Sequence, residues 1–150
     1  MKPKIALIGL LIGTLLAITA CSGGARPNYT HATVIWSVGF PHELTQRVTW
    51  TVSITDGTVE RVEQEEGEVR TADYPLAHQE AFLQALHRAL NTDPIPLCAD
   101  ANTVVAQARD DTTQLYASEL QQCDQQRRIT DALITELDRG SGAVSPGVDG

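Results

Sequence analysis

Lysine is nearly absent from this chain of 150 residues, because Lys2 and Lys4 are the only two. The rest of the chain therefore has no lysine for a Schiff base, for the phosphate-binding position of a P-loop or for a Ser-x-x-Lys acylase. Positive charge is scarce in general, since 11 Lys and Arg stand against 19 Asp and Glu, a formal net charge of −8. This deficit excludes a nucleic-acid-binding protein, which needs clustered positive charge against phosphates.

Motifs of metal and nucleophilic catalysis are missing as well. The four histidines form no His-x-x-x-His pair, and neither His-Glu-x-x-His nor Gly-x-Ser-x-Gly occurs. Asp100-Ala-Asn102 begins like a calcium loop, but Val104 stands where the next oxygen ligand belongs. We therefore expect no metal and no cofactor, and the sequence names no catalytic residue. A catalytic carboxylate pair is the one alternative that these absences leave open.

The first twenty residues have the pattern of a secretory signal. The two lysines precede an apolar run from Ile5 to Ile18, and Ser22-Gly23-Gly24 follows. The run is shorter than the roughly 20 apolar residues that a transmembrane helix needs. This pattern of a basic n-region, a short apolar stretch and small residues before a cleavage site predicts a removable signal peptide over residues 1–20.

Within that signal, Ile18-Thr19-Ala20-Cys21 resembles the lipobox of bacterial lipoproteins. The resemblance implies cleavage after Ala20, S-diacylglycerylation of Cys21 and acylation of the new amino terminus. Cys21 would then hold the protein in a lipid bilayer of the bacterial cell envelope, since each buried CH2 adds about 0.8 kcal/mol of membrane affinity. Ser22 after the cysteine implies the outer membrane, facing the periplasm, in a Gram-negative host. An ordinary secreted protein is the alternative.

Four segments make up the predicted chain: the signal peptide (1–20), the lipidated cysteine and tether (21–30), a single domain (31–139) and a disordered tail (140–150). After cleavage no lysine remains, and nine arginines stand against 19 acidic residues, a charge of −10. Anionic lipid head groups repel a mature protein of this charge, so the acyl chains must hold it at the membrane. Its charge favours a basic partner, mainly through faster encounter.

Two runs of strict apolar–polar alternation predict the first hairpin. Residues 34–38 and 48–54 each place their apolar side chains on one face, with Gly39–Arg47 as the connecting loop. Folding the chain about Glu43 makes all three cross-strand pairs apolar, which is what sets register. The expected pairs are Val38–Val48, Trp36–Trp50 and Val34–Val52.

The next turn and strand are read from Asp56-Gly57, which predicts a two-residue type I′ turn. It returns the chain as a polar edge strand, Thr58–Gln64, with a bulge near Glu60-Arg61. Glu68–Ala72 fits a short fourth strand. The acidic side chains of this region form either a solvated edge that blocks aggregation or a docking site for a basic partner. They are Glu60, Glu63, Glu65, Glu66 and Glu68.

The second half alternates helices and strands. Residues 75–90 have helical spacing of apolar residues, with Pro75 in the first turn. Strands follow over Thr103–Arg109 and Thr113–Leu120, and a second helix starts at an Asp124 cap and is closed by Gly140. The order β-β-β-(β)-α-β-β-α predicts an α+β fold, with an antiparallel sheet of about five strands and both helices on one face.

Cys98 and Cys123 are the cysteines that remain once Cys21 is acylated. In an oxidising compartment they are expected to form a disulfide, worth roughly 3.5 kcal/mol in the chain-entropy model. A redox or metal pair is the alternative, although no Cys-x-x-Cys occurs. The segment from Cys98-Ala-Asp to Cys123-Asp and the following helix resembles a pattern in small uncharacterised bacterial envelope lipoproteins. That resemblance implies an envelope domain and transfers no functional residue.

Trp36 and Trp50, with Phe40 nearby, are the best candidates for recognition. They form a core if the helices cover their face, and a platform for a sugar or peptide if the helices cover the other face. The function that fits best is a membrane-anchored, non-catalytic binding or accessory module, with another envelope protein as its partner. The alternatives are an inhibitor of a basic secreted hydrolase and a carboxylate-dependent enzyme acting on envelope polymers.

Overall fold

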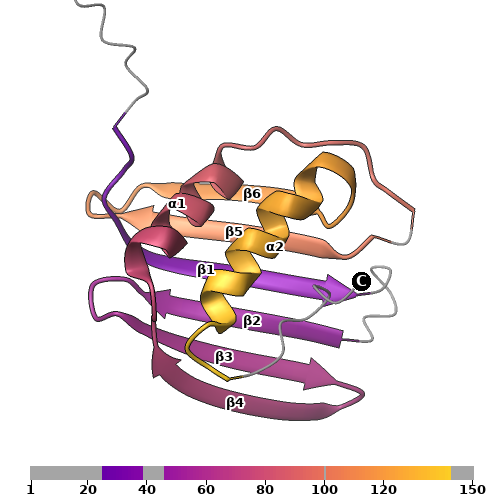
Figure 1. Ribbon diagram of the computed structural model, residues 1–150, viewed down its shortest axis with the longest axis horizontal. Coiled ribbons are helices and arrows are strands. Elements are labelled where there is room, and N and C mark those ends of the chain that lie inside the picture. Colours follow the sequence, from indigo (N-terminus) through magenta and orange to yellow (C-terminus); the bar gives the residue numbers. More distant parts are fainter. Residues whose placement is uncertain (1–24, 39–45, 100, 143–150) are drawn as a thin grey trace, which may run out of the picture.

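A computed structural model describes residues 25–38, 46–99 and 101–142 of the chain (Figure 1). Six strands form one antiparallel sheet in the order β4-β3-β2-β1-β5-β6, and two helices complete the fold. The α+β class is confirmed, with six strands where about five were expected. The predictions for the signal peptide, Cys21 and Phe40 lie outside the described residues. The elements are β1 (Tyr29–Val38), β2 (Gln46–Ser53), β3 (Thr58–Glu65), β4 (Glu68–Pro75), α1 (Gln79–Leu90), β5 (Thr103–Asp110), β6 (Leu115–Gln121) and α2 (Asp124–Asp138).

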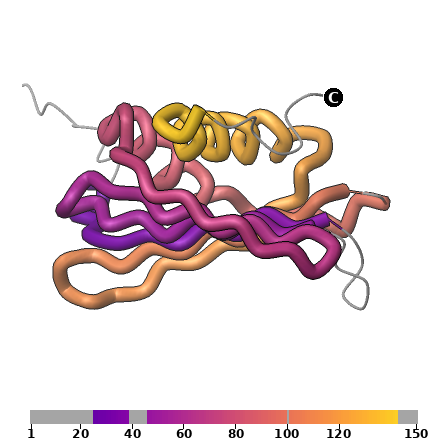
Figure 2. The backbone as a smooth tube through the Cα atoms, turned by 90° about the horizontal axis from the view of Figure 1, so that it is seen from below, coloured from indigo at the N-terminus to yellow at the C-terminus, as the bar shows by residue number. Residues whose placement is uncertain are grey.

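The fold has two layers, with both helices on the same face of the sheet (Figure 2). Because side chains alternate along a strand, every second residue of the central strands points to the helices and is buried. Val34 and Val48 are fully buried, and so are Phe82 of α1 and Leu133 of α2. The opposite face of the sheet, which we call the open face, has no helix over it in the described part of the chain.

The register of β1 and β2 differs from the predicted one by two residues. Trp36 lies opposite Val48, and Val34 lies opposite Trp50, so the two tryptophans do not pair directly. β2 begins at Gln46, inside the segment predicted as loop, and Gln46 pairs with Val38. A shift of two residues keeps every side chain on its face, so alternation alone does not distinguish the two registers.

The prediction of a two-residue turn at Asp56-Gly57 was wrong. β2 ends at Ser53 and β3 begins at Thr58, which leaves four residues in the turn. Gly57 has a φ of 67°, a conformation that glycine adopts without a steric penalty. The predicted bulge near Glu60-Arg61 is not observed either, because β2 and β3 pair without a register shift.

β3 was expected at the edge of the sheet but is an interior strand. β4 pairs with it along its whole length, from Thr58 opposite Pro75 to Glu65 opposite Glu68. Pro75 therefore ends β4 and does not begin a helix, and α1 starts at Gln79. Proline has no N–H for a sheet hydrogen bond, so it is tolerated on an edge strand.

α2 follows its prediction closely, with one correction at its N-terminus and with Gly140 directly after its C-cap residue as predicted. Cys123 is the N-cap residue, and Asp124 is the first helical residue. Gly140 follows the C-cap residue Arg139, where it packs against β4: a Cβ atom at this position would collide with the carbonyl oxygen of Pro75. Among the described residues, neither helix is long and apolar enough to cross a membrane.

Candidate functional site

Trp36 and Trp50 lie in the core, between the sheet and the helices. Their exposed fractions are 2% and 0%. Trp36 donates its Nε1 hydrogen to Oε1 of Gln122 at 3.0 Å, and Trp50 donates to Oδ1 of Asp138 at 2.8 Å. Gln122 precedes α2 and Asp138 is its last residue, so the two indoles hold both ends of this helix to the sheet. These tryptophans are therefore not a surface platform for a sugar or peptide.

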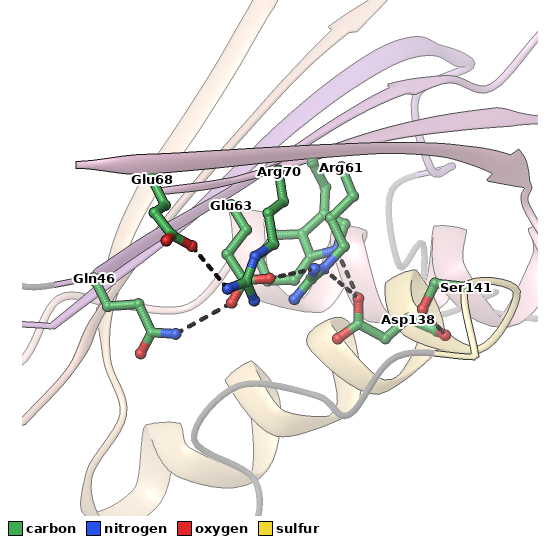
Figure 3. A network of polar contacts seen from close by, with 8 residues as sticks. Gln46, Arg61, Glu63, Glu68, Arg70, Asp138 and Ser141 are labelled. Carbon is green, nitrogen blue, oxygen red and sulfur yellow. Dashed lines mark hydrogen bonds and ion pairs between the residues drawn. The ribbon is translucent and has the colours of Figure 1, made fainter. Parts of the chain in front are cut away.

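A polar network surrounds the end of α2 (Figure 3). The Nε atom of Arg61 lies 3.4 Å from Oδ1 of Asp138, and its Nη1 atom lies 2.9 Å from Oε2 of Glu63. The guanidinium also lies over the ring of Trp50, 5.9 Å from its centroid. Gln46 donates to the other oxygen of Glu63 at 3.3 Å. Arg61 and Asp138 are both buried, so the network keeps two charges paired inside the domain.

Tyr74 of β4 is buried beside this network. Burial, followed by the negative charge of Asp138, raises the pKa of its phenol to about 12. A phenol with this pKa stays protonated at neutral pH. It therefore supplies no general base, and its place against Gly140 makes it part of the joint between β4 and α2.

A second cluster lies where β1 begins. The hydroxyl of Tyr29 hydrogen-bonds to Nδ1 of His87 at 3.0 Å, and its ring packs edge-on against Tyr116, with centroids 5.4 Å apart. Burial raises the pKa of Tyr29. No sequence pattern predicts the Tyr29–His87 contact, because its partners are 58 residues apart in the chain.

Asp110 closes the turn between β5 and β6, as expected for an aspartate in this position. Its Oδ1 atom accepts hydrogen bonds from the hydroxyl of Thr112 and from the backbone N–H groups of Thr112 and Gln114, and its Oδ2 atom accepts one from Tyr116. These bonds, led by the one from the Thr112 side chain, lower the pKa of Asp110. A catalytic acid on envelope polymers needs a raised carboxyl pKa, and Asp110 has the opposite shift.

Cys98 and Cys123 form the predicted disulfide, with their Cα atoms 6.6 Å apart. The bond joins the segment before β5 to the N-cap of α2. The carboxylate of Asp124 lies close to both sulfur atoms. Because the sulfurs are bonded to each other, they are not the thiolates that a metal site requires, so the group is structural.

The open face of the sheet carries mainly hydroxyl and branched aliphatic side chains, with Arg47, Glu60 and Glu119 among them. They come from the positions of each strand that alternate with the buried ones. Most of them are partly exposed, and Leu115 is 52% exposed. The central members of this face are Thr33, Ile35, Ser37, Thr49, Thr51, Ser53, Val62, Thr103 and Val105.

A hollow of about 130 Å³ lies on the open face, where β1, β5 and β6 meet near the start of β1. His31 lies directly opposite Arg109 in the β1–β5 register, and Thr33 lies opposite Gln107. With Leu115, these side chains line the hollow, and no carboxylate is among its lining residues. We call it the His31–Arg109 pocket. The pocket was not predicted from the sequence, because none of these residues belongs to a motif.

The acidic residues of the β3–β4 hairpin gather at the other end of the sheet. Glu65, Glu66 and Glu68 are exposed at its turn, where Glu66 and Gly67 both have positive φ. β1 ends on this side, whereas the His31–Arg109 pocket lies where β1 begins (Figure 1). The domain therefore has an acidic end and, at the opposite end, a pocket with two basic side chains.

Comparisons with protein-family models, with curated proteins and with solved structures give no match.

Proposed function

We propose that this protein is a lipid-anchored lipoprotein of the bacterial cell envelope whose domain is a non-catalytic binding module. The open face of the sheet is its recognition surface. The observation that carries this proposal is the one-sided sheet: both helices pack on one face, which leaves six strands of partly exposed side chains on the other. A broad face of regular strands presents side chains in defined positions, as a binding surface requires.

The way in which the helical layer is held supports this role. Trp36 and Trp50 bond to both ends of α2, and the Cys98–Cys123 disulfide ties the start of α2 to the segment before β5. A scaffold fixed at these points loses little conformational entropy when its opposite face binds a partner.

The entry of the chain into the domain supports an anchored module. Arg26 forms two hydrogen bonds to Glu80 of α1, at 2.9 and 3.0 Å, so the chain is held to the domain from this residue on. Arg26 lies five positions after Cys21, which the lipobox resemblance makes the lipid attachment site. Five extended residues span at most about 18 Å, so the lipid keeps the domain close to the bilayer. The acidic turn at Glu66 then points away from it.

Site-specific photo-crosslinking in the native envelope tests the proposal. A photoreactive amino acid replaces Thr49 on the open face, or Gln84 on the exposed side of α1 as a matched control. We expect a dominant crosslinked partner from position 49, no such product from position 84, and loss of the product when Cys21→Ser removes the anchor. A partner captured only from position 84 would contradict the assignment of the open face.

The acidic end of the domain favours a second candidate, an inhibitor of a basic secreted hydrolase. Glu65, Glu66 and Glu68 are exposed and stand at the end away from the anchor. Inhibition would be strong at low ionic strength, would weaken with salt and would be lost when the three are changed to glutamine. If a hydrolase is inhibited equally by the triple variant, this turn is not the contact.

A further inference from the structure

We propose that the His31–Arg109 pocket binds a phosphate group. This inference rests on the proposed function in one respect, because it names a ligand for part of the open face. The proposed ligand of the pocket is a phosphoester, carried by a lipid head group or by a soluble molecule. The pocket is built from two neighbouring register pairs of β1 and β5, so the backbone hydrogen bonds of two strands near the centre of the sheet hold its donors in place.

No acidic side chain balances the charge of Arg109 within the pocket. Among the described residues, four arginines pair with carboxylates at 2.8–3.0 Å. Arg109 is one of the five described arginines that do not, and of these it is the one that lines a hollow together with a histidine. In the described part of the chain, the guanidinium of Arg109 donates one hydrogen bond, and it is long, 3.5 Å from Nη1 to the carbonyl oxygen of Thr113. In a chain of net charge −8, an uncompensated guanidinium beside an imidazole makes a local site for an anion. The paired arginines are Arg26, Arg61, Arg70 and Arg139.

The donor set favours phosphate over a carboxylate. Arg109 supplies a planar fork of N–H groups, His31 a ring N–H, Thr33 a hydroxyl and Gln107 an amide NH₂. A tetrahedral phosphate offers three or four acceptor oxygens to donors that come from two strands, whereas a carboxylate offers two in one plane. The side chain of Leu115 forms an apolar wall, which suits the carbon atoms of an ester.

Chemical protection of His31 tests the pocket in the full chain, in a maltoside detergent that contains no phosphate. Diethyl pyrocarbonate modifies accessible histidines, and His78, whose side chain is 58% exposed and lies outside the pocket, is an internal control. We expect sn-glycerol 3-phosphate to slow modification of His31 several-fold and saturably, with His78 unaffected. Acetate at the same ionic strength should protect neither residue.

Variants separate the pocket from general electrostatics. Arg109→Gln should weaken protection of His31 roughly tenfold or more, because a hydrogen bond to a charged group is lost. Arg109→Lys should restore part of the protection. Arg128→Gln, which removes an exposed arginine of α2 outside the pocket, should leave protection unchanged. Unchanged protection in Arg109→Gln would overturn the proposal, as would equal protection by acetate.

Reconstitution distinguishes the two sources of the phosphate. Protection of His31 in phosphatidylglycerol vesicles, but not in vesicles of an uncharged glycolipid, assigns the ligand to a lipid head group. Protection by glycerol phosphate alone assigns it to a soluble phosphoester, and protection by neither overturns the proposal. If position 49 still crosslinks a partner in that last case, the pocket fails and the proposed function stands.

Discussion

Trp50 and Asp138 meet at the joint between the sheet and α2, where the indole donates a 2.8 Å hydrogen bond to the carboxylate. The exposed fractions of the two residues are 0% and 3%. Arg61 supplies the opposite charge at 3.4 Å, so a hydrogen bond and an ion pair use the same carboxylate oxygen. The joint holds the end of α2 at the middle of β2, so the packing of this end of the helix depends on one buried acid.

Removal of that acid should destabilise the domain. Asp138→Ala leaves the buried guanidinium of Arg61 without this carboxylate, and we expect a loss of roughly 3–5 kcal/mol in the free energy of unfolding. Asp138→Asn keeps an acceptor for Trp50 and should cost less. Urea unfolding followed by tryptophan fluorescence measures both. Equal, small effects of the two substitutions would mean that the ion pair contributes little.

The disulfide should contribute roughly 3.5 kcal/mol, because it closes a loop with a sequence separation of 25 residues. Cys98→Ser should therefore lower the melting temperature markedly. In the unchanged protein, iodoacetamide should label positions 98 and 123 only after a reductant is added, as peptide mass spectrometry would show. Labelling at either position without a reductant would contradict the bond.

Tyr74 should make the protein less stable in alkali. Its pKa is about 12 in the folded state and about 10 in the unfolded chain, so its stabilising effect is complete below pH 10. As the pH rises from about 10 to 12, the unfolded chain loses this proton first and stability falls, by at most roughly 2–3 kcal/mol. Tyr74→Phe should flatten this part of the melting-temperature profile. An unchanged slope would contradict the raised pKa.

Asp110 should make the stability of the protein fall in acid. The pKa of Asp110 is lower in the folded protein than in the unfolded chain, so its carboxylate stabilises the fold at pH values above the pKa of the unfolded chain. This stabilisation is lost as the pH falls through the pKa of the folded state. Asp110→Asn should lower the melting temperature at pH 7 and reduce its decline in acid. Asp111→Asn is the matched control, since Asp111 is exposed and bonds to the side chain of Asn28. A control with the same effect as Asp110→Asn would assign the decline to other carboxylates.

Where each side chain points could be predicted from the sequence. The alternation around Trp36 and Trp50 predicted one apolar face for both strands, and both residues are buried on it. The helical spacing after Asp124 predicted α2, and the pair of remaining cysteines predicted the disulfide. The strand and helix predictions succeed because burial of apolar side chains at a regular period acts along a short stretch of chain. The disulfide followed instead from the number of cysteines.

Only the tertiary structure decided how these segments fit together. Shifting β1 against β2 by two residues keeps the same faces, so the pairing of Val34 with Trp50 was not determined by the pattern. The place of Pro75 depended on β3 providing a partner strand, because a proline tolerates both an edge strand and a first helical turn.

For the candidate functional sites, too, some properties follow from the sequence and others only from the tertiary structure. Net charge and the scarcity of lysine are properties of composition, and they narrowed the classes of function before any fold was known. The contacts of Asp138 with Trp50 and of His31 with Arg109 join residues 88 and 78 positions apart. Such contacts follow from strand register and from how the helices pack on the sheet, and no local period of the sequence encodes either.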